Sequence, residues 1–286
     1  MSKKNGAICT QINKKINNNS EICEILKHYS LKGKVIIITG GYGYFGVSIC
    51  KELLKFGAIV YLTGRNKTKL NKIKKKFNTV DTIKYEHLDI SNSVSIKKTL
   101  AKINKSENKI DILINNAVFG KTGSFDSQDQ TAFLKSINGT LGGVYEMSKN
   151  CFPYLKENRN IGTIINIASM YGVVVPNENN YNHNNQKSSP GYVAGKSAII
   201  QLTKHMASAW GIYGIRVNTV SPGPFPNISG SSKNSLFIEK LKSNIPLGRV
   251  GEPVTDLCGL IIFLCSNASK FITGQNFIVD GGWTIL

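Results

Sequence analysis

Two tyrosine and lysine pairs have a spacing at which the lysine could tune the tyrosine hydroxyl. Tyr192 and Lys196 lie four residues apart, as do Tyr145 and Lys149, so within a helix each pair would emerge on one face. A tyrosine near its reference pKa of about 10 exchanges protons poorly at neutral pH, and a neighbouring ammonium group favours its charged form. The spacing alone proves nothing in a lysine-rich chain. Context favours Tyr192, which opens a predicted helix soon after Ser169 ends a strand, whereas Tyr145 lies in the middle of a helix.

A glycine-rich turn at residues 39–46 joins the first predicted strand to a helix. Glycine lets the backbone turn sharply and lets a pyrophosphate approach the amide groups at a helix N-terminus, where the helix dipole favours anions. Between a strand and a helix, such a turn favours dinucleotide binding over a purely structural turn. The residues expected to contact the dinucleotide here are Gly40, Tyr42, Gly43, Tyr44, Phe45 and Gly46.

The end of the second predicted strand indicates which dinucleotide is bound. An acidic residue there would bind the ribose hydroxyls of NAD, but the chain has Arg65, which can hold the 2′-phosphate of NADP. Six lysines follow between residues 67 and 76, and most of them are expected to form a solvated helix face. The sequence therefore predicts NADP, with NAD as the alternative.

Strands and helices alternate along the chain, which predicts an α/β fold: a single-domain Rossmann fold with a doubly wound, seven-stranded parallel sheet flanked by helices. Residues 31–286 form this domain, and residues 1–30 form an N-terminal extension, partly disordered with a short helix from residue 20. The strands are expected near 35–38, 58–62, 82–88, 110–114, 163–168, 215–220 and 276–279. The helices are expected near 45–56, 66–77, 93–105, 129–150, 190–210, 234–243 and 252–266.

Composition excludes several classes of protein. The 286 residues are 41% hydrophobic and 19% charged, and no apolar run reaches membrane-spanning length. The first thirty residues lack the apolar core of a secretory signal, so we expect a cytoplasmic protein. The formal charge of +19 comes from 32 lysines and only 4 arginines, whereas base and phosphate recognition favours arginine. No specific nucleic-acid partner is therefore predicted.

Cysteine and histidine spacing gives no sign of a metal site. The six cysteines contain no CxxC pair and the four histidines contain no HxxxH pair. We predict free thiols and no structural metal.

Further residues complete a pattern that runs from Leu31 to Gly282. In chain order its members are the glycine turn, Asp89, Asn115 to Ala117, Asn138, Ser169, Tyr192 with Lys196, Arg216 to Asn218, Pro222 with Gly223, and Asp280 to Gly282. This order resembles the short-chain dehydrogenase/reductase family, in particular its short single-domain branch. The resemblance implies a hydride-transferring enzyme that interconverts a secondary alcohol and a ketone, and that forms a dimer or tetramer.

The resemblance also assigns roles to residues. It implies a catalytic tetrad of Asn138, Ser169, Tyr192 and Lys196. It implies that Asp89 approaches the adenine and that Asn115 to Ala117 support the nucleotide pocket. The further cofactor contacts that we expect are Asn116, Ala117, Tyr192, Lys196, Pro222 and Gly223.

The chain departs from the family pattern in the glycine turn. Tyr44 stands where the short branch has a glycine, and the turn instead fits the longer branch that modifies sugar nucleotides, which raises an epimerase or dehydratase alternative. Only about 65 residues follow Val220, too few for the separate substrate domain of that branch. Val118 also replaces a glycine that commonly follows Asn-Asn-Ala.

Between Ser169 and Tyr192 lie 22 residues, about ten more than is usual in the family. This insertion is either a surface decoration or part of the substrate mouth. Together with residues 221–226 and the tail at 279–283, it resembles family members associated with bacterial surface-glycan or flagellin-glycan biosynthesis, which implies a sugar-like, polar small molecule as substrate. The alternatives are a 3-oxoacyl-carrier-protein reductase and, in another class, a non-catalytic NAD(P)-binding sensor or regulator. A sensor would not need Ser169, Tyr192 and Lys196.

Overall fold

The computed structural model describes residues 20–77, 81–120, 123–157, 162–177, 189–227 and 235–286. They form one seven-stranded sheet in the order β3-β2-β1-β4-β5-β6-β7, with every neighbouring pair parallel. The strands are β1 (Val35–Ile38), β2 (Ile59–Gly64), β3 (Ile83–His87), β4 (Ile112–Asn115), β5 (Thr163–Ile167), β6 (Arg216–Pro222) and β7 (Asn276–Val279). The predicted fold class is confirmed.

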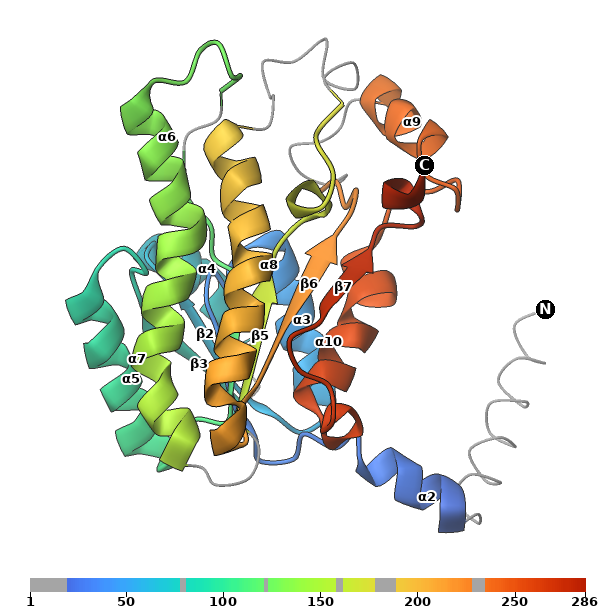
Figure 1. Cartoon of the computed structure of the whole chain (residues 1–286). Coiled ribbons are helices and arrows are strands. Elements are labelled where there is room, and N and C mark those ends of the chain that lie inside the picture. Colours follow the sequence, from blue (N-terminus) through green and yellow to red (C-terminus); the bar gives the residue numbers. More distant parts are fainter. Residues whose placement is uncertain (1–19, 78–80, 121–122, 158–161, 178–188, 228–234) are drawn as a thin grey trace.

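Helices cover both faces of the sheet, as Figure 1 shows. The central strands are buried along their whole length, which is why they read as continuous apolar runs such as Val35–Ile38. One apolar cluster joins the sheet to α3 (Tyr44–Lys55), α4 (Lys67–Lys76) and α10 (Cys258–Cys265). A second joins its other face to α5 (Ser93–Glu107), α7 (Gly143–Glu157) and α8 (Pro190–Trp210).

One predicted helix is longer and less regular than expected. The helix expected near 129–150 begins as α6 (Gln130–Ile137), passes through a π-helical segment, η1 (Asn138–Gly142), and continues as α7 to Glu157. It runs past Pro153 although proline removes a helix hydrogen bond, because Cys151 and Leu155 on either side are buried against the sheet. Similarly, the helix expected near 252–266 consists of η5 (Pro253–Leu257), which is π-helical, followed by α10.

The remaining elements lie at the ends and edges of the sheet. They are α2 (Ser20–Lys27), α9 (Ser235–Ser243) and the short 3₁₀ segments η2 (Met170–Gly172), η4 (Gly211–Tyr213), η6 (Asn267–Ser269) and η7 (Trp283–Ile285). The described residues after β6 add one strand to the same sheet and helices beside it, and they contain no second sheet. The separate substrate domain of the longer branch is therefore absent from this part of the chain.

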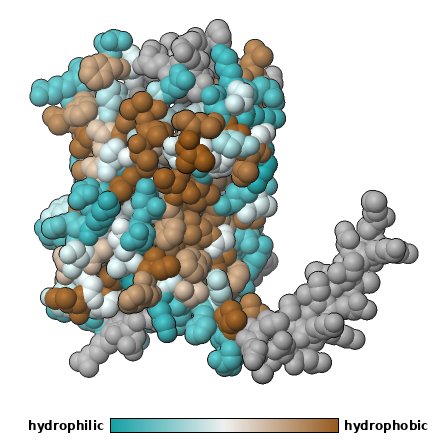
Figure 2. Space-filling model, turned by 45° about the vertical axis from the view of Figure 1, so that its right-hand side comes forward, coloured by the Kyte–Doolittle hydropathy of each residue, from teal (hydrophilic) through white to brown (hydrophobic). Residues whose placement is uncertain are grey.

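Strand β7 forms one edge of the sheet, and apolar side chains gather on this side of the molecule (Figure 2). Ile278 on that strand is 39% exposed, and Ile285 and Leu286 at the C-terminus are also exposed. No helix within the described ranges is both long enough and apolar enough to cross a membrane.

Candidate active site

The glycine turn is shaped by close contacts with the loop that follows β4. Gly40 has a φ of +63°, and a Cβ there would lie 2.9 Å from the Cα of Ala117. Thr39 Oγ1 accepts hydrogen bonds from the backbone N–H groups of Asn116 and Ala117, both at 3.0 Å. The Asn116 side-chain amide donates to the carbonyl oxygens of Thr39 and Gly40. These contacts hold the carboxyl end of β1 against the carboxyl end of β4.

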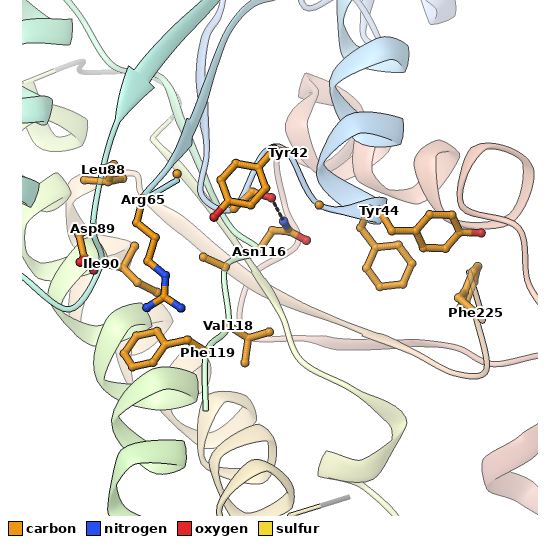
Figure 3. A pocket seen from close by; sticks show the side chains of 15 residues that line it. Tyr42, Tyr44, Arg65, Leu88, Asp89, Ile90, Asn116, Val118, Phe119 and Phe225 are labelled. Carbon is orange, nitrogen blue, oxygen red and sulfur yellow. Dashed lines mark hydrogen bonds between the residues drawn. The ribbon is translucent and has the colours of Figure 1, made fainter. Parts of the chain in front are cut away.

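A cavity of about 320 Å³ lies above this turn and is shown in Figure 3. Arg65, Asp89 and Phe119 stand at one end of it, Tyr44 and Phe225 stand at the other, and Tyr42 and Asn116 lie between them. Among the residues predicted to bind the cofactor, Gly40, Tyr42, Gly43, Tyr44, Phe45, Arg65, Asp89, Asn116 and Ala117 line it. Gly64, Leu88, Ile90, Val118, Phe119 and Phe225 also line it and were not among those predictions.

The end of the cavity near β2 and β3 is polar and charged. The Arg65 guanidinium carbon lies 5.3 Å from the centre of the Phe119 ring, which is a cation–π distance. Burial alone would raise the pKa of Asp89, but hydrogen bonds from Ser91 and the charge of Arg65 hold that pKa below its usual value. A carboxylate and a guanidinium are thus both charged at this end at neutral pH.

The opposite end is aromatic. The rings of Tyr44 and Phe45 stack with their centres 5.7 Å apart, and Phe45 meets Phe225 edge-on at 5.6 Å. Tyr44, at the position where the short branch has glycine, therefore stands at the start of α3 and lines the cavity. Burial, and then the negative charge of Glu252, raise the pKa of Tyr44, so this phenol stays protonated at neutral pH.

Ser169, Tyr192 and Lys196 come together at the carboxyl end of β5. Ser169 follows the strand and is buried, and its Oγ accepts a hydrogen bond from the Tyr171 backbone N–H at 3.1 Å. Lys196 lies one turn after Tyr192 in α8, with its Nζ 5.5 Å from the centre of the tyrosine ring. That Nζ also donates to the carbonyl oxygen of Ile167, the last residue of β5, at 2.6 Å.

The environment of Lys196 lowers its affinity for a proton. The side chain is buried, and burial lowers the pKa of Lys196 to about 7. A lysine that exchanges a proton near neutral pH is suited to carry protons as well as charge. The sequence interpretation gave this lysine the role of an ammonium group that favours the charged form of Tyr192.

Asn138 lies where the long helix changes to its π-helical segment. The neighbouring turn is close to α8, because a Cβ on Gly195 would lie 2.8 Å from the Cβ of Thr140. A Cβ on Gly142 would lie 2.2 Å from Asn138 Oδ1, so this glycine makes room for the Asn138 side chain. The segment that carries Asn138 therefore packs directly beside the residue preceding Lys196.

Some of the residues predicted to bind the cofactor do not line the large cavity, and Tyr192 and Lys196 are among them. Gly46 is buried in α3, where a Cβ would lie 2.7 Å from the Cα of Gly41, so it lets the helix close on the turn. Pro222 and Gly223 end β6, and a Cβ on Gly223 would meet Asp280 at 2.5 Å. Both positions bring backbones close together.

The second tyrosine and lysine pair lies on the outside of α7. Tyr145 is 46% exposed, and the Nζ of Lys149 is 5.6 Å from the centre of its ring. The pair therefore has the same spacing as Tyr192 and Lys196 and a similar cation–π distance, but it is not buried.

Asn115 and Arg216 belong to the pattern found in the sequence, but the sequence did not reveal the buried hydrogen bonds that they form. Asn115 donates to Asn166 Oδ1 at 2.8 Å, and Asn166 donates to Thr203 Oγ1 at 2.8 Å, which ties β4, β5 and α8 together. Arg216 donates to Thr163 Oγ1 and to the carbonyl oxygen of Leu264. One of the four arginines is thereby committed to the core.

Comparison with known proteins places this site in a family. A family model described as enoyl-(acyl carrier protein) reductase matches residues 45–284. A tropinone reductase homologue of Arabidopsis thaliana is 33% identical over 272 residues, which cover 91% of this chain and 95% of the relative. The chain belongs to the short-chain dehydrogenase/reductase family. The prediction of an oxidoreductase of this family is therefore confirmed.

Two solved structures of this family hold nicotinamide dinucleotides. A gluconate 5-dehydrogenase from Burkholderia cenocepacia, in complex with NADP and tartrate, is 27% identical with a TM-score of 0.81, over 91% of this chain and 99% of that one. A short-chain dehydrogenase from Leptospira borgpetersenii with bound NAD⁺ is 31% identical with a TM-score of 0.79, over 89% and 94%. These structures agree with the type of cofactor predicted from the glycine turn.

The described part of the chain contains no group of three His, Cys, Asp or Glu side chains that could hold a metal ion. Cys50, Cys151, Cys258 and Cys265 are buried free thiols, and burial raises the pKa of each to about 12. Nucleophilic thiol chemistry at neutral pH is thereby disfavoured at these four positions.

Proposed function

We propose that the protein is an NAD(P)-dependent oxidoreductase that interconverts a secondary alcohol and a ketone, with NADP as the preferred cofactor. The observation that carries the proposal is the meeting of Ser169, Tyr192 and Lys196 at the end of β5. Open α/β sheets bind ligands at this edge, and the large cavity opens there over β1 and β4.

The residues of the tetrad would act on the oxygen of the substrate. Ser169 already accepts a hydrogen bond from Tyr171 through its oxygen, which leaves its O–H group to donate to a carbonyl oxygen. Tyr192 would transfer its phenolic proton to that oxygen during reduction and take it back during oxidation. Lys196 would then return the proton to Tyr192, and Asn138 would position a water that links Lys196 to solvent.

The cavity offers a suitable cradle for the dinucleotide. Gly40 and Gly43 would admit the pyrophosphate, Asp89, Asn116 and Ala117 would hold the adenosine part, and Arg65 would bind a 2′-phosphate. Gly40 fits this role because a side chain there would collide with Ala117. When bound, the nicotinamide ring supplies the hydride.

The direct test replaces one oxygen atom. Tyr192→Phe keeps the ring and removes the transferable proton, so turnover should fall by about 10²-fold or more. NADPH affinity, measured by fluorescence titration, should stay within about twofold. Tyr145→Phe is the matched control and should remain active. Loss of turnover in a folded Tyr145→Phe protein would show that the wrong pair had been assigned.

Cofactor preference has its own test. NADPH should bind more tightly than NADH, and Arg65→Asp should reverse or abolish that preference by placing a carboxylate against the 2′-phosphate. Equal affinities in the unmutated protein would reject the assignment of Arg65.

For the substrate, two classes have support. The insertion before Tyr192 supports a sugar-like, polar molecule of the kind used in surface-glycan or flagellin-glycan biosynthesis, and the similarity to a gluconate 5-dehydrogenase agrees with it. Half of the residues between Ser169 and Tyr192, namely residues 178–188, lie outside the described residues. The alternative, a 3-oxoacyl-carrier-protein substrate, has support from the acyl carrier protein named in the description of the matching family model and from the apolar cluster against which Tyr192 packs. That cluster consists of Met170, Tyr171, Ile238, Leu241, Ile245 and Trp283.

A panel of sugar acids, polyols and 3-oxoacyl thioesters, followed by NADPH absorbance, separates these classes. A kcat/KM at least tenfold higher for one class identifies it.

We further propose a homo-oligomer in which a second copy covers the β7 edge, since an uncovered edge strand invites pairing. Sedimentation of a monomer at micromolar concentration would contradict that part. Cytoplasmic localisation stays a prediction.

A further inference from the structure

The corner where β2 ends and α4 begins brings a tyrosine of the glycine turn against the backbone. Gly64 is the last residue of β2, and a Cβ there would lie 2.2 Å from Cε1 of Tyr42. The Tyr42 ring can therefore lie against this corner only because residue 64 has no side chain. Figure 3 shows Tyr42 beside Arg65 in the cavity.

Lys69 is held over the same ring. Asn66 caps α4 by accepting a hydrogen bond from the Lys69 backbone N–H at 2.9 Å, which places Lys69 in the first turn of the helix. Its Nζ lies 5.7 Å from the centre of the Tyr42 ring. Among the six lysines between residues 67 and 76, Lys69 alone has such a contact with a described ring that lines the cavity.

Two cations thus flank one corner, each supported by an aromatic ring. Arg65 lies over Phe119 and Lys69 lies over Tyr42. Neither forms an ion pair within 4.0 Å with any carboxylate in the described part of the chain. Weak cation–π support leaves both charges available to an anion while limiting where the side chains stand.

The charge of a phosphate monoester calls for more than one cation. Such a group carries about −1.5 to −2 at neutral pH. One arginine can bind two of its oxygens with parallel hydrogen bonds, and this leaves about one negative charge uncompensated. Lysine serves as a point charge on a flexible stem, which suits the remaining oxygen.

We propose that Lys69, positioned by Tyr42, is a second ligand for the 2′-phosphate on the cofactor's adenosine, so that Arg65 and Lys69 share the discrimination between NADP and NAD. The proposal rests on the proposed dinucleotide function. It also gives Tyr42 a purpose, because a smaller residue in the turn would leave Lys69 without its support.

The test uses the full chain and isothermal titration with two probes, adenosine 2′,5′-bisphosphate and AMP. These probes differ only in the 2′-phosphate. Lys69→Ala should weaken binding of the bisphosphate about five- to tenfold and change AMP binding less than twofold. Lys74→Ala removes the same charge from the far side of the same helix, and it should change the ratio of the two affinities less than twofold.

A double-mutant cycle tests the role of Tyr42. In a Tyr42→Leu background, Lys69→Ala should reduce the affinity ratio by at most twofold, because Lys69 is then no longer held in place. The proposal is overturned if Lys69→Ala changes the ratio no more than Lys74→Ala does. It is also overturned if Lys69→Ala keeps its full effect without Tyr42. If neither adenosine 2′,5′-bisphosphate nor NADPH binds the unmutated protein, the dinucleotide function itself fails.

Discussion

The buried state of Lys196 should make stability depend on pH in an unusual direction. The pKa of Lys196 falls from an ordinary 10.5 to about 7 in the folded protein. Between these two values the unfolded chain holds one more proton than the folded chain, so the free energy of unfolding rises with pH. Above pH 10.5 the lysine is neutral in both states and the dependence ends. Below pH 7 the full cost of charging the buried amine, roughly 5 kcal/mol, is present.

Lys196→Met removes the titrating group and keeps most of the length of the side chain. Between pH 7.5 and 9.5, the free energy of unfolding should rise by about 2.5 kcal/mol more for the unmutated protein than for this variant. Near pH 7 the variant should be the more stable of the two. Its advantage is reduced by about 1 kcal/mol because the carbonyl oxygen of Ile167 loses its hydrogen-bond donor.

Urea unfolding monitored by circular dichroism at pH 7.5, 8.5 and 9.5 measures this difference. Ionisable groups that do not contact Lys196 titrate equally in both proteins and cancel. Lys149→Met is the control, because Lys149 has the same spacing to a tyrosine but is exposed, and its curve should run parallel to that of the unmutated protein. Parallel curves for Lys196→Met as well would refute the argument that burial lowers the pKa of this lysine.

Two further predictions concern packing. Gly139→Ala should lower the free energy of unfolding by about 2–3 kcal/mol, because a Cβ there would lie 1.8 Å from the carbonyl oxygen of Phe119. Gly211→Ala is the control: its Cβ would have open space around it, so this change should be neutral or slightly stabilising. Thermal melts compare the two variants. Cys151 and Cys265 should resist alkylation at pH 8 in the folded protein, since burial keeps both thiols protonated, and they should react fully in urea. Peptide mass spectrometry measures the labelling, and rapid labelling of the folded chain would contradict this prediction.

The order of the elements could be predicted because each strand carries its own local signal. Strands buried on both faces, such as β1 and β5, appear as short apolar runs bounded by turn residues. The exposed edge strand β7 was also located at its observed bounds, residues 276–279. Their alternation with helical segments then leaves few topologies, since crossovers between parallel strands are right-handed.

The irregular helix could not be predicted in the same way. Apolar residues recur through residues 130–157 without a break, so periodicity gives no sign of the π-helical turn at Asn138. That turn packs against α8 through Thr140 and Gly195, which are 55 residues apart in the chain. The helix also continues past Pro153 to Glu157, because burial of the flanking Cys151 and Leu155 outweighs the missing hydrogen bond.

Some residues of the candidate site could be predicted from the sequence and others could not, for the same reason. Gly40, Arg65 and Asp89 could be located because each follows a strand, and the carboxyl ends of parallel strands meet at one edge of the sheet. Phe119 and Phe225 could not, because their roles arise from contacts with Arg65 and Phe45 that are distant in the sequence. The type of a residue that directly follows a strand is enough to suggest a role in the site. A side chain that acts by supporting another side chain can be found only once the structure shows the contact.

The two ends of the cavity explain why Tyr44 is tolerated in the glycine turn. Gly40 must lack a side chain because Ala117 occupies the space, and Gly46 must lack one because the turn folds back on the helix. Residue 44 meets no such obstacle: it begins α3, and its side chain stacks on Phe45 at the rim of the cavity, where it is 37% exposed. Glycine is therefore required in this turn only at the positions where a side chain would collide with a neighbouring part of the backbone. The turn thus follows the glycine spacing of the longer branch, while the described residues form a single seven-stranded sheet with Lys196 placed beside the Tyr192 ring.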